Sequence, residues 1–165
     1  TPLDALAVVN TIASGRFQSA WPFEAATGSG VEGNFEAVGC HVRLNEGQSL
    51  RTELSSRFEK PRGEDGVRVM FDAPNFDLDS QGTMQDAFEI TVTDSEGNIV
   101  TQPYLPGRTA GINWSERADA ASGVAVVVNH LPDDSPDTYE AILNLAHLPD
   151  GQEVVVTIRT CTPRS

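Results

Sequence analysis

The sequence predicts an all-β protein: an antiparallel β-sandwich, jelly-roll-like in topology, preceded by a short N-terminal helix or docking segment. From residue 35 onward, apolar and polar residues alternate with the period of two of a half-buried strand. Clusters of Gly, Pro and Asp separate these runs, and helical spacing is confined to the start of the chain. Periodicity alone does not separate a jelly roll from an immunoglobulin-like sandwich.

Residues 1–13 are the predicted helix. Pro2 suits a first helical turn, Thr1 can cap it, and apolar residues follow at helical spacing. The same residues also alternate imperfectly, so a strand is the alternative.

A Gly- and Ser-rich patch at residues 27–33 reads as a linker. We therefore divide the chain into an N-terminal segment with its linker, residues 1–33, and a β-sandwich domain, residues 34–165.

The clearest strand carries Phe88, Ile90 and Val92 on one face, with polar residues on the other. Turn chemistry follows at residues 94–98, and residues 99–104 are predicted to return as the second strand of a hairpin. Further strands are predicted over residues 38–44, 48–58, 67–71, 112–114, 124–128, 139–145 and 154–158.

Charge restricts the partners. The 165 residues carry a formal net charge of −13 and include a single lysine, Lys60. Such a chain is repelled by nucleic-acid phosphate and by anionic lipid, so neither is an expected partner. No run approaches the roughly 18 apolar residues of a membrane span, so no membrane insertion is expected. There is also no signal-peptide pattern, and we expect any such peptide to lie outside this sequence.

The two cysteines, Cys40 and Cys161, predict a disulfide. Closing a loop of this length contributes about 4–5 kcal/mol in the chain-entropy model. The alternative is a pair of free buried thiols. A disulfide places the protein in an oxidising compartment, outside the cell or on its surface.

A set of short motifs lies along residues 44–116: LNEGQSL at 44–50, FDAPNFD at 71–77, DAFE at 86–89, DSEGN at 94–98, Gly107-Arg108 and INWSE at 112–116. In this order and spacing the set resembles a β-sandwich domain that recurs in very large secreted and cell-surface proteins of aquatic bacteria. The resemblance weakens through residues 148–151 and departs at 159–162. It implies adhesion, matrix or glycan contact, and not catalysis.

Residues 1–12 are similar to the end of a dockerin-type calcium repeat, in which Thr1 and Asp4 would be the last loop positions. The aspartates that precede them in such a repeat are missing, so these residues alone do not complete a calcium loop. The similarity implies a multidomain extracellular parent protein.

Calcium is the predicted ligand, as a structural ion. Asp86 precedes Phe88 by two residues, so strand geometry places it on the same, apolar face. A carboxylate on the core side of a strand needs hydrogen bonds or a cation. The resemblance implies Glu46, Asp77 and Asp86 as calcium ligands. The alternative is that these acidic residues are solvated loop residues of an acidic protein.

Polysaccharide is a second candidate ligand. Tyr104, Arg108 and Trp114 are the candidate glycan contacts, because sugars stack on exposed aromatic rings backed by polar groups. The alternative is that the aromatic rings pack in the core or at a sheet edge.

No catalytic motif accompanies the three histidines, so we expect a non-enzymatic protein. The leading hypothesis is an extracellular structural or adhesive protein, a subunit of a cell-surface assembly or filament. It would contact copies of itself or other surface proteins through the N-terminal segment, as a helix in a groove or as an added strand. The alternative is a calcium-stabilised carbohydrate-binding module of a secreted multidomain protein.

Overall fold

The fold comes from a computed structural model, which describes residues 4–13, 16–18, 34–38, 41–45, 51–60, 62–63, 65–72, 87–115, 118–123, 126–131 and 138–161. Every regular element within these residues is a β-strand, and the strands form two sheets in which all pairs are antiparallel. The predicted all-β, two-sheet architecture is therefore confirmed for the part of the chain that is described.

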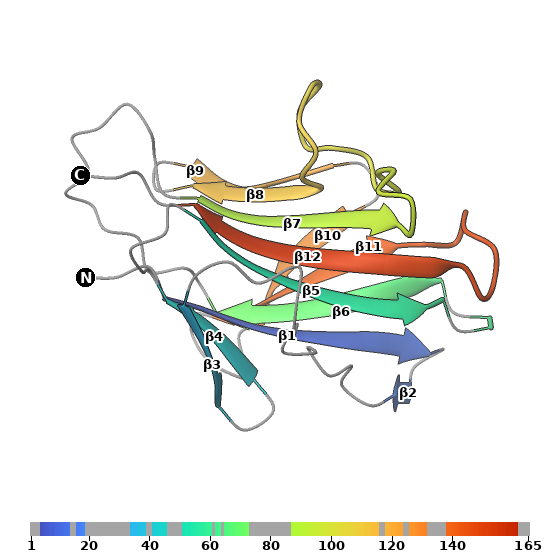
Figure 1. The fold of residues 1–165 in the computed structure, drawn as a ribbon, viewed down its shortest axis with the longest axis horizontal. Helices are drawn as coiled ribbons and strands as arrows, with labels where there is room; N and C mark the ends of the chain where they lie inside the picture. The colour runs from blue at the N-terminus through green and yellow to red at the C-terminus, as the bar shows by residue number, and fades with distance from the viewer. Residues whose placement is uncertain are drawn as a thin grey trace.

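The first sheet has seven strands, and six of them lie side by side (Figure 1). In order across the sheet they are β10 (Val126–His130), β11 (Thr138–Asn144), β6 (Gly66–Asp72), β1 (Asp4–Ala13), β4 (His41–Asn45) and β3 (Asn34–Val38). The seventh strand, β2 (Arg16–Gln18), pairs with the end of β1.

The second sheet has five strands and faces the first. Its order is β5 (Arg51–Glu59), β12 (Glu153–Cys161), β7 (Ala87–Asp94), β8 (Ile112–Ser115) and β9 (Ala118–Ser122). β12 is late in the sequence, yet it pairs with β5 along one side and with β7 along the other.

The core lies between the two sheets and is built from alternate residues of six strands. The buried apolar set includes Leu54, Phe58, Val67, Val69, Phe71, Phe88, Ile90, Val92, Ile112, Ala141, Leu143, Val154, Val156 and Ile158. These are the faces that the alternation predicts, and their burial confirms it. Removing this apolar surface from water is the main stabilising contribution to the fold.

Aromatic rings join the two sheets. The Phe71 ring of β6 lies 4.9 Å from the Phe88 ring of β7, and the Tyr139 ring of β11 lies 4.6 Å from the Trp114 ring of β8, centroid to centroid. Both pairs cross from one sheet to the other, so these residues fix how the sheets face each other.

The N-terminal prediction needs a correction. Residues 4–13 form the strand β1 and not a helix, which is the alternative that the imperfect alternation left open. β1 pairs antiparallel with β6 from Ala7 to Ile12 and with β4 from Asp4 to Ala7. Two neighbouring strands supply backbone partners here, and such tertiary pairing overrides a weak local preference for helix.

Other strands also differ from expectation. The run predicted as one strand over residues 38–44 is instead parts of two antiparallel strands, β3 and β4, which pair from Asn34 opposite Asn45 to Val38 opposite His41. The apolar alternation continues through both strands, so the pattern alone does not show where the chain reverses. The run predicted over residues 124–128 corresponds to β10, Val126–His130, at the edge of the seven-stranded sheet, where it pairs with β11. β9 was not predicted, because the sequence ADAAS lacks the β-branched and aromatic residues that mark a strand. No helix long and apolar enough to cross a membrane occurs among the described residues.

Candidate interaction site: an excursion loop between β7 and β8

The predicted turn after β7 is held by one carboxylate. Oδ1 of Asp94 accepts hydrogen bonds from the backbone amides of Glu96 and Asn98, at 2.9 and 2.8 Å. The Asn98 side chain donates to the other Asp94 oxygen at 2.9 Å, and this bond is the main cause of the lowered pKa of Asp94. Gly97 takes a positive φ of 84°, as the turn requires. The hairpin therefore begins as predicted.

The return strand of the hairpin is interrupted. Ile99 pairs with Thr93, and the Val100 amide donates to the Val92 carbonyl at 3.0 Å. Pairing with β7 then stops, and resumes when the Gly111 amide donates to the Ile90 carbonyl at 2.9 Å. The predicted return strand 99–104 is thus correct only as far as Val100. Residues 101–110 leave the sheet as a loop, which we call the excursion loop.

The excursion loop has defined internal hydrogen bonds. The Tyr104 amide donates to the Ala110 carbonyl at 3.0 Å, and the Arg108 amide donates to the Leu105 carbonyl at 3.2 Å. Gly107 sits at φ 79°, a conformation that glycine adopts without strain. Figure 1 shows the chain between β7 and β8 projecting beyond β8. The tip is therefore presented away from the sheets in a turn of fixed backbone shape.

The base of the excursion loop packs closely against the end of β9. Thr101 and Ala110 are buried, and the Gly123 amide donates to the Gly111 carbonyl at 2.8 Å. A Cβ at Gly123 would lie 1.8 Å from the Gln102 carbonyl oxygen. Only glycine fits at that distance, so this residue permits the close approach that seats the loop.

The tip carries the side chains suited to contact. Leu105 is 52% exposed and Ile99, at the entry to the loop, is 39% exposed; these are the exposed large hydrophobic residues of the described chain. Arg108 is exposed and Tyr104 is partly buried. An apolar side chain beside a guanidinium can bind the surface of another protein, and the tyrosine and arginine together can bind a sugar.

Trp114 lies apart from these residues in the chain, on β8. Its partly buried ring packs against Tyr139, and its centroid is also 6.2 Å from that of Phe71. The structure thus brings two of the three candidate glycan contacts, Tyr104 and Arg108, into the excursion loop. A glycan role for any of the three stays a prediction.

Three charged residues and one asparagine of the five-stranded sheet form a row across four strands. The Arg159 Nε of β12 lies 3.1 Å from Oε2 of Glu53 on β5, and its Nη1 lies 3.6 Å from Oε2 of Glu89 on β7. The Asn113 side chain of β8 then donates to Glu89 at 2.9 Å. The register places these residues directly opposite one another, so the row braces the outer face of the sheet.

A second row braces the seven-stranded sheet. The Arg68 Nε of β6 lies 3.0 Å from Oε2 of Glu140 on β11, and the Asn129 side chain of β10 donates to the other oxygen of Glu140 at 3.1 Å. All three strands are neighbours, so this row also links strands to one another.

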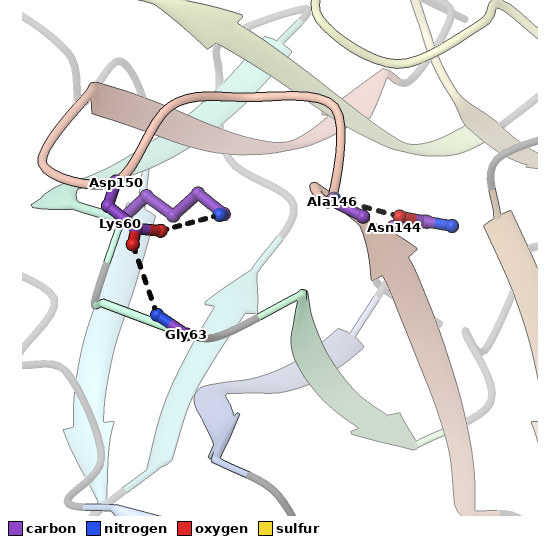
Figure 2. Close-up of polar contacts among 5 residues, drawn as sticks. All are labelled: Lys60, Gly63, Asn144, Ala146 and Asp150. Atoms are coloured by element: carbon purple, nitrogen blue, oxygen red, sulfur yellow. Dashed lines mark hydrogen bonds and ion pairs between the residues drawn. The ribbon is translucent and has the colours of Figure 1, made fainter.

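The only lysine of the chain closes one end of the sandwich (Figure 2). Lys60 is 5% exposed, and its Nζ lies 3.0 Å from Oδ1 of Asp150, whose other oxygen accepts from the Gly63 amide at 3.3 Å. The lysine hydrogen bond is the main cause of the lowered pKa of Asp150. The sequence analysis did not predict this pair, although Lys60 follows Phe58 by two residues and so falls on the same, inward face as Leu54 and Phe58.

The candidate calcium ligands Glu46, Asp77 and Asp86 lie outside the described residues, as does Cys40. Cys161 ends β12. Within the part of the chain that the structure describes, no three His, Cys, Asp or Glu residues are grouped as a metal site. The calcium site and the Cys40–Cys161 disulfide therefore stay predictions.

No model of a known protein family, no curated protein and no solved structure matches the chain.

Proposed function

We propose that the protein is a non-enzymatic extracellular structural or adhesive β-sandwich protein, a subunit of a cell-surface assembly. The observation that supports this proposal most is the excursion loop. It interrupts a strand pairing, is seated by Gly123, and presents Leu105 to solvent. Loops positioned by a rigid scaffold are where binding residues concentrate.

The use of charge supports the same proposal. Charged residues of both sheets bond to residues of neighbouring strands, in one row that contains Arg159 and another that contains Glu140. Such networks hold strands in register and leave the outer faces braced. Strands held in register in this way suit a structural protein.

Burial of one exposed leucine by a partner gives a small binding free energy, which is useful when the same contact is repeated many times. Full burial of a leucine side chain contributes roughly 1.5–3 kcal/mol, and Leu105 is half exposed before any partner binds. A single contact of this size is weak. Repetition along an assembly multiplies it, because linked contacts raise the effective concentration of each other.

The test replaces Leu105 with aspartate. We expect Leu105→Asp to abolish attachment of the purified chain to cells or to its own assemblies, measured by sedimentation and by electron microscopy of the native material. Gln102→Asp is the matched control, since Gln102 is exposed on the same loop and the substitution adds the same charge. Attachment that survives Leu105→Asp unchanged contradicts the proposed role of the loop.

Glycan binding is the second candidate, because Tyr104 and Arg108 share the excursion loop. In this version the protein is a carbohydrate-binding module, stabilised by calcium at Glu46, Asp77 and Asp86. A glycan array run with and without calcium separates the two candidates. Binding that disappears in Tyr104→Ala supports the module, and an array without signal favours the structural role.

A further inference from the structure

β1 occupies a slot in the middle of the seven-stranded sheet. On one side it pairs with β6, from Ala7 opposite Phe71 to Ile12 opposite Gly66. On the other side it pairs with β4, from Asp4 opposite Asn45 to Ala7 opposite Val42. Figure 1 shows β1, in blue, running alongside β6. Among the described strands, β1 is the backbone link between β6 and the β3–β4 hairpin.

An empty slot would be costly. Without β1, β6 becomes an edge strand with a row of unpaired amides and carbonyls, a ready template for another strand. Its alternate residues Val67, Val69 and Phe71 belong to the buried core, so this edge borders apolar surface. The slot therefore needs an occupant, and the backbone hydrogen bonds do not depend on which chain provides it.

The connection of β1 to the sheet allows the occupant to come from elsewhere. After β2 ends at Gln18, the chain has fifteen residues, 19–33, before β3 begins at Asn34. Fully extended, such a segment spans about 50 Å, at roughly 3.3 Å per residue. That reach exceeds what a tight hairpin gives, so the connection does not confine β1 to its own sheet.

From these observations we infer that β1 is an exchangeable strand, and that its partner is a second copy of this chain. The β1 of one copy pairs with the β6 and β4 of another in the same register, as in domain swapping and strand addition. Exchange between two copies gives a closed dimer, and passing the strand onward gives an open chain. This inference deepens the proposed function by naming the partner, but it depends on β1 and not on the excursion loop.

Register gives the exchange its specificity. A one-residue slip would move every side chain of β1 to the opposite face of the sheet. Asn10 lies opposite Arg68 in the observed pairing. Two cysteines at directly opposite positions of antiparallel strands have the separation that a disulfide needs. Positions 10 and 68 therefore report which chain fills the slot.

The experiment mixes two full-length variants with different isotope labels, Asn10→Cys and Arg68→Cys, and refolds them together under mild oxidation. We expect a crosslinked product of twice the chain mass, in which mass spectrometry finds position 10 of one label joined to position 68 of the other. Arg68→Cys mixed with Arg108→Cys is the control for random encounter, because Arg108 is exposed on the excursion loop. A heterotypic product no more abundant than in this control overturns the inference.

A second measurement holds even if the single variants fold poorly. A chain carrying both substitutions, oxidised as a dilute monomer, has β1 fastened to its own β6. We expect this locked chain to lose assembly and to recover it on reduction. If the locked chain assembles as well as its reduced form, exchange of β1 is wrong, while the proposed function through the excursion loop stands.

The two proposals fail separately. If the exchange crosslinks form and Leu105→Asp has no effect on attachment, the strand exchange is supported. The same pair of results contradicts the role of the loop. Crosslinks found only in closed dimers support the exchange and contradict an open filament.

Discussion

Two loops at the ends of strands show opposite uses of side chains. The loop between β11 and β12, residues 145–152, is tied to the β5–β6 end of the sandwich: the Leu145 amide donates to the Asp65 carbonyl and the Gly151 amide to the Lys60 carbonyl, both at 2.8 Å. Its side chains also hold the fold, through the contact of Asp150 with Lys60. The excursion loop is fastened at its base, next to Gly123, and presents Leu105 to solvent.

The difference tells which loop to examine for function. Side chains that bond within the molecule are explained by stability, as are those of Asp150 and His147 in the loop 145–152. Stability does not explain an exposed apolar side chain such as Leu105, which the excursion loop presents to solvent. The following substitutions test this contrast, from the largest expected effect on stability to the smallest.

Gly123→Ala should have the largest effect. The added Cβ would meet a backbone oxygen, and a backbone atom cannot rotate away as a side chain can. Overpacking of this kind costs about 3 kcal/mol at its upper range. Urea unfolding measures the loss, and Ser122→Ala, one residue earlier and exposed, is the control. A Gly123→Ala protein with wild-type stability would mean that the loop base is not closely seated.

Lys60→Ala should come next. The lysine is nearly fully buried, so truncation removes the packing of its aliphatic stem as well as the bond to Asp150. We expect a loss of about 2 kcal/mol in the free energy of unfolding, as for other losses of buried side chains. Lys60→Met keeps the stem and should lose clearly less. Equal losses in the two variants would assign the effect to the charge and not to the packing.

Asp150→Asn should change the pH dependence of stability. In the folded protein the Lys60 hydrogen bond lowers the pKa of Asp150 below its ordinary value of 3.8. Its contribution to stability is therefore present above that value and is lost as the pH falls through the lower, folded-state pKa. The thermal unfolding temperature of Asp150→Asn should fall less steeply than that of the wild type as the pH is lowered. If the unfolding temperatures of the two proteins fall in parallel at acid pH, the ionisation of this carboxylate is not coupled to folding.

Leu105→Asp should have the smallest effect on stability. Exposed surface substitutions usually stay within about 0.5 kcal/mol of the wild type, and Leu105 has half its surface in water already. The same urea series measures this change. A large loss here would remove the contrast between the two loops, because it would give Leu105 a role in the fold.

The strand faces were predictable from the sequence because burial follows parity. Phe88, Ile90 and Val92 alternate without interruption, and all three are fully buried. β1 was harder, since the signals for a helical first turn are local, and its strand partners β4 and β6 lie more than thirty and more than fifty residues away in the chain. Local patterns carry no information about such partners.

The excursion loop was only partly predictable. Tyr104 and Arg108 were candidates from their chemistry, but Leu105 was not, because a leucine in a sequence of alternating residues looks like part of a strand. The close approach at Gly123 depends on where β9 meets the loop. That contact is a property of the folded sheet, and no short stretch of sequence contains it.

The central place of β12 has a consequence for how the chain reaches its final form. β5 and β7 have no shared border until β12 lies between them, and Ser55 bonds to Thr157 across a separation of 102 residues. During synthesis, the five-stranded sheet therefore cannot be completed before residues 153–161 have been made. Because these pairings join distant parts of the chain, we expect the five-stranded sheet to form late and slowly.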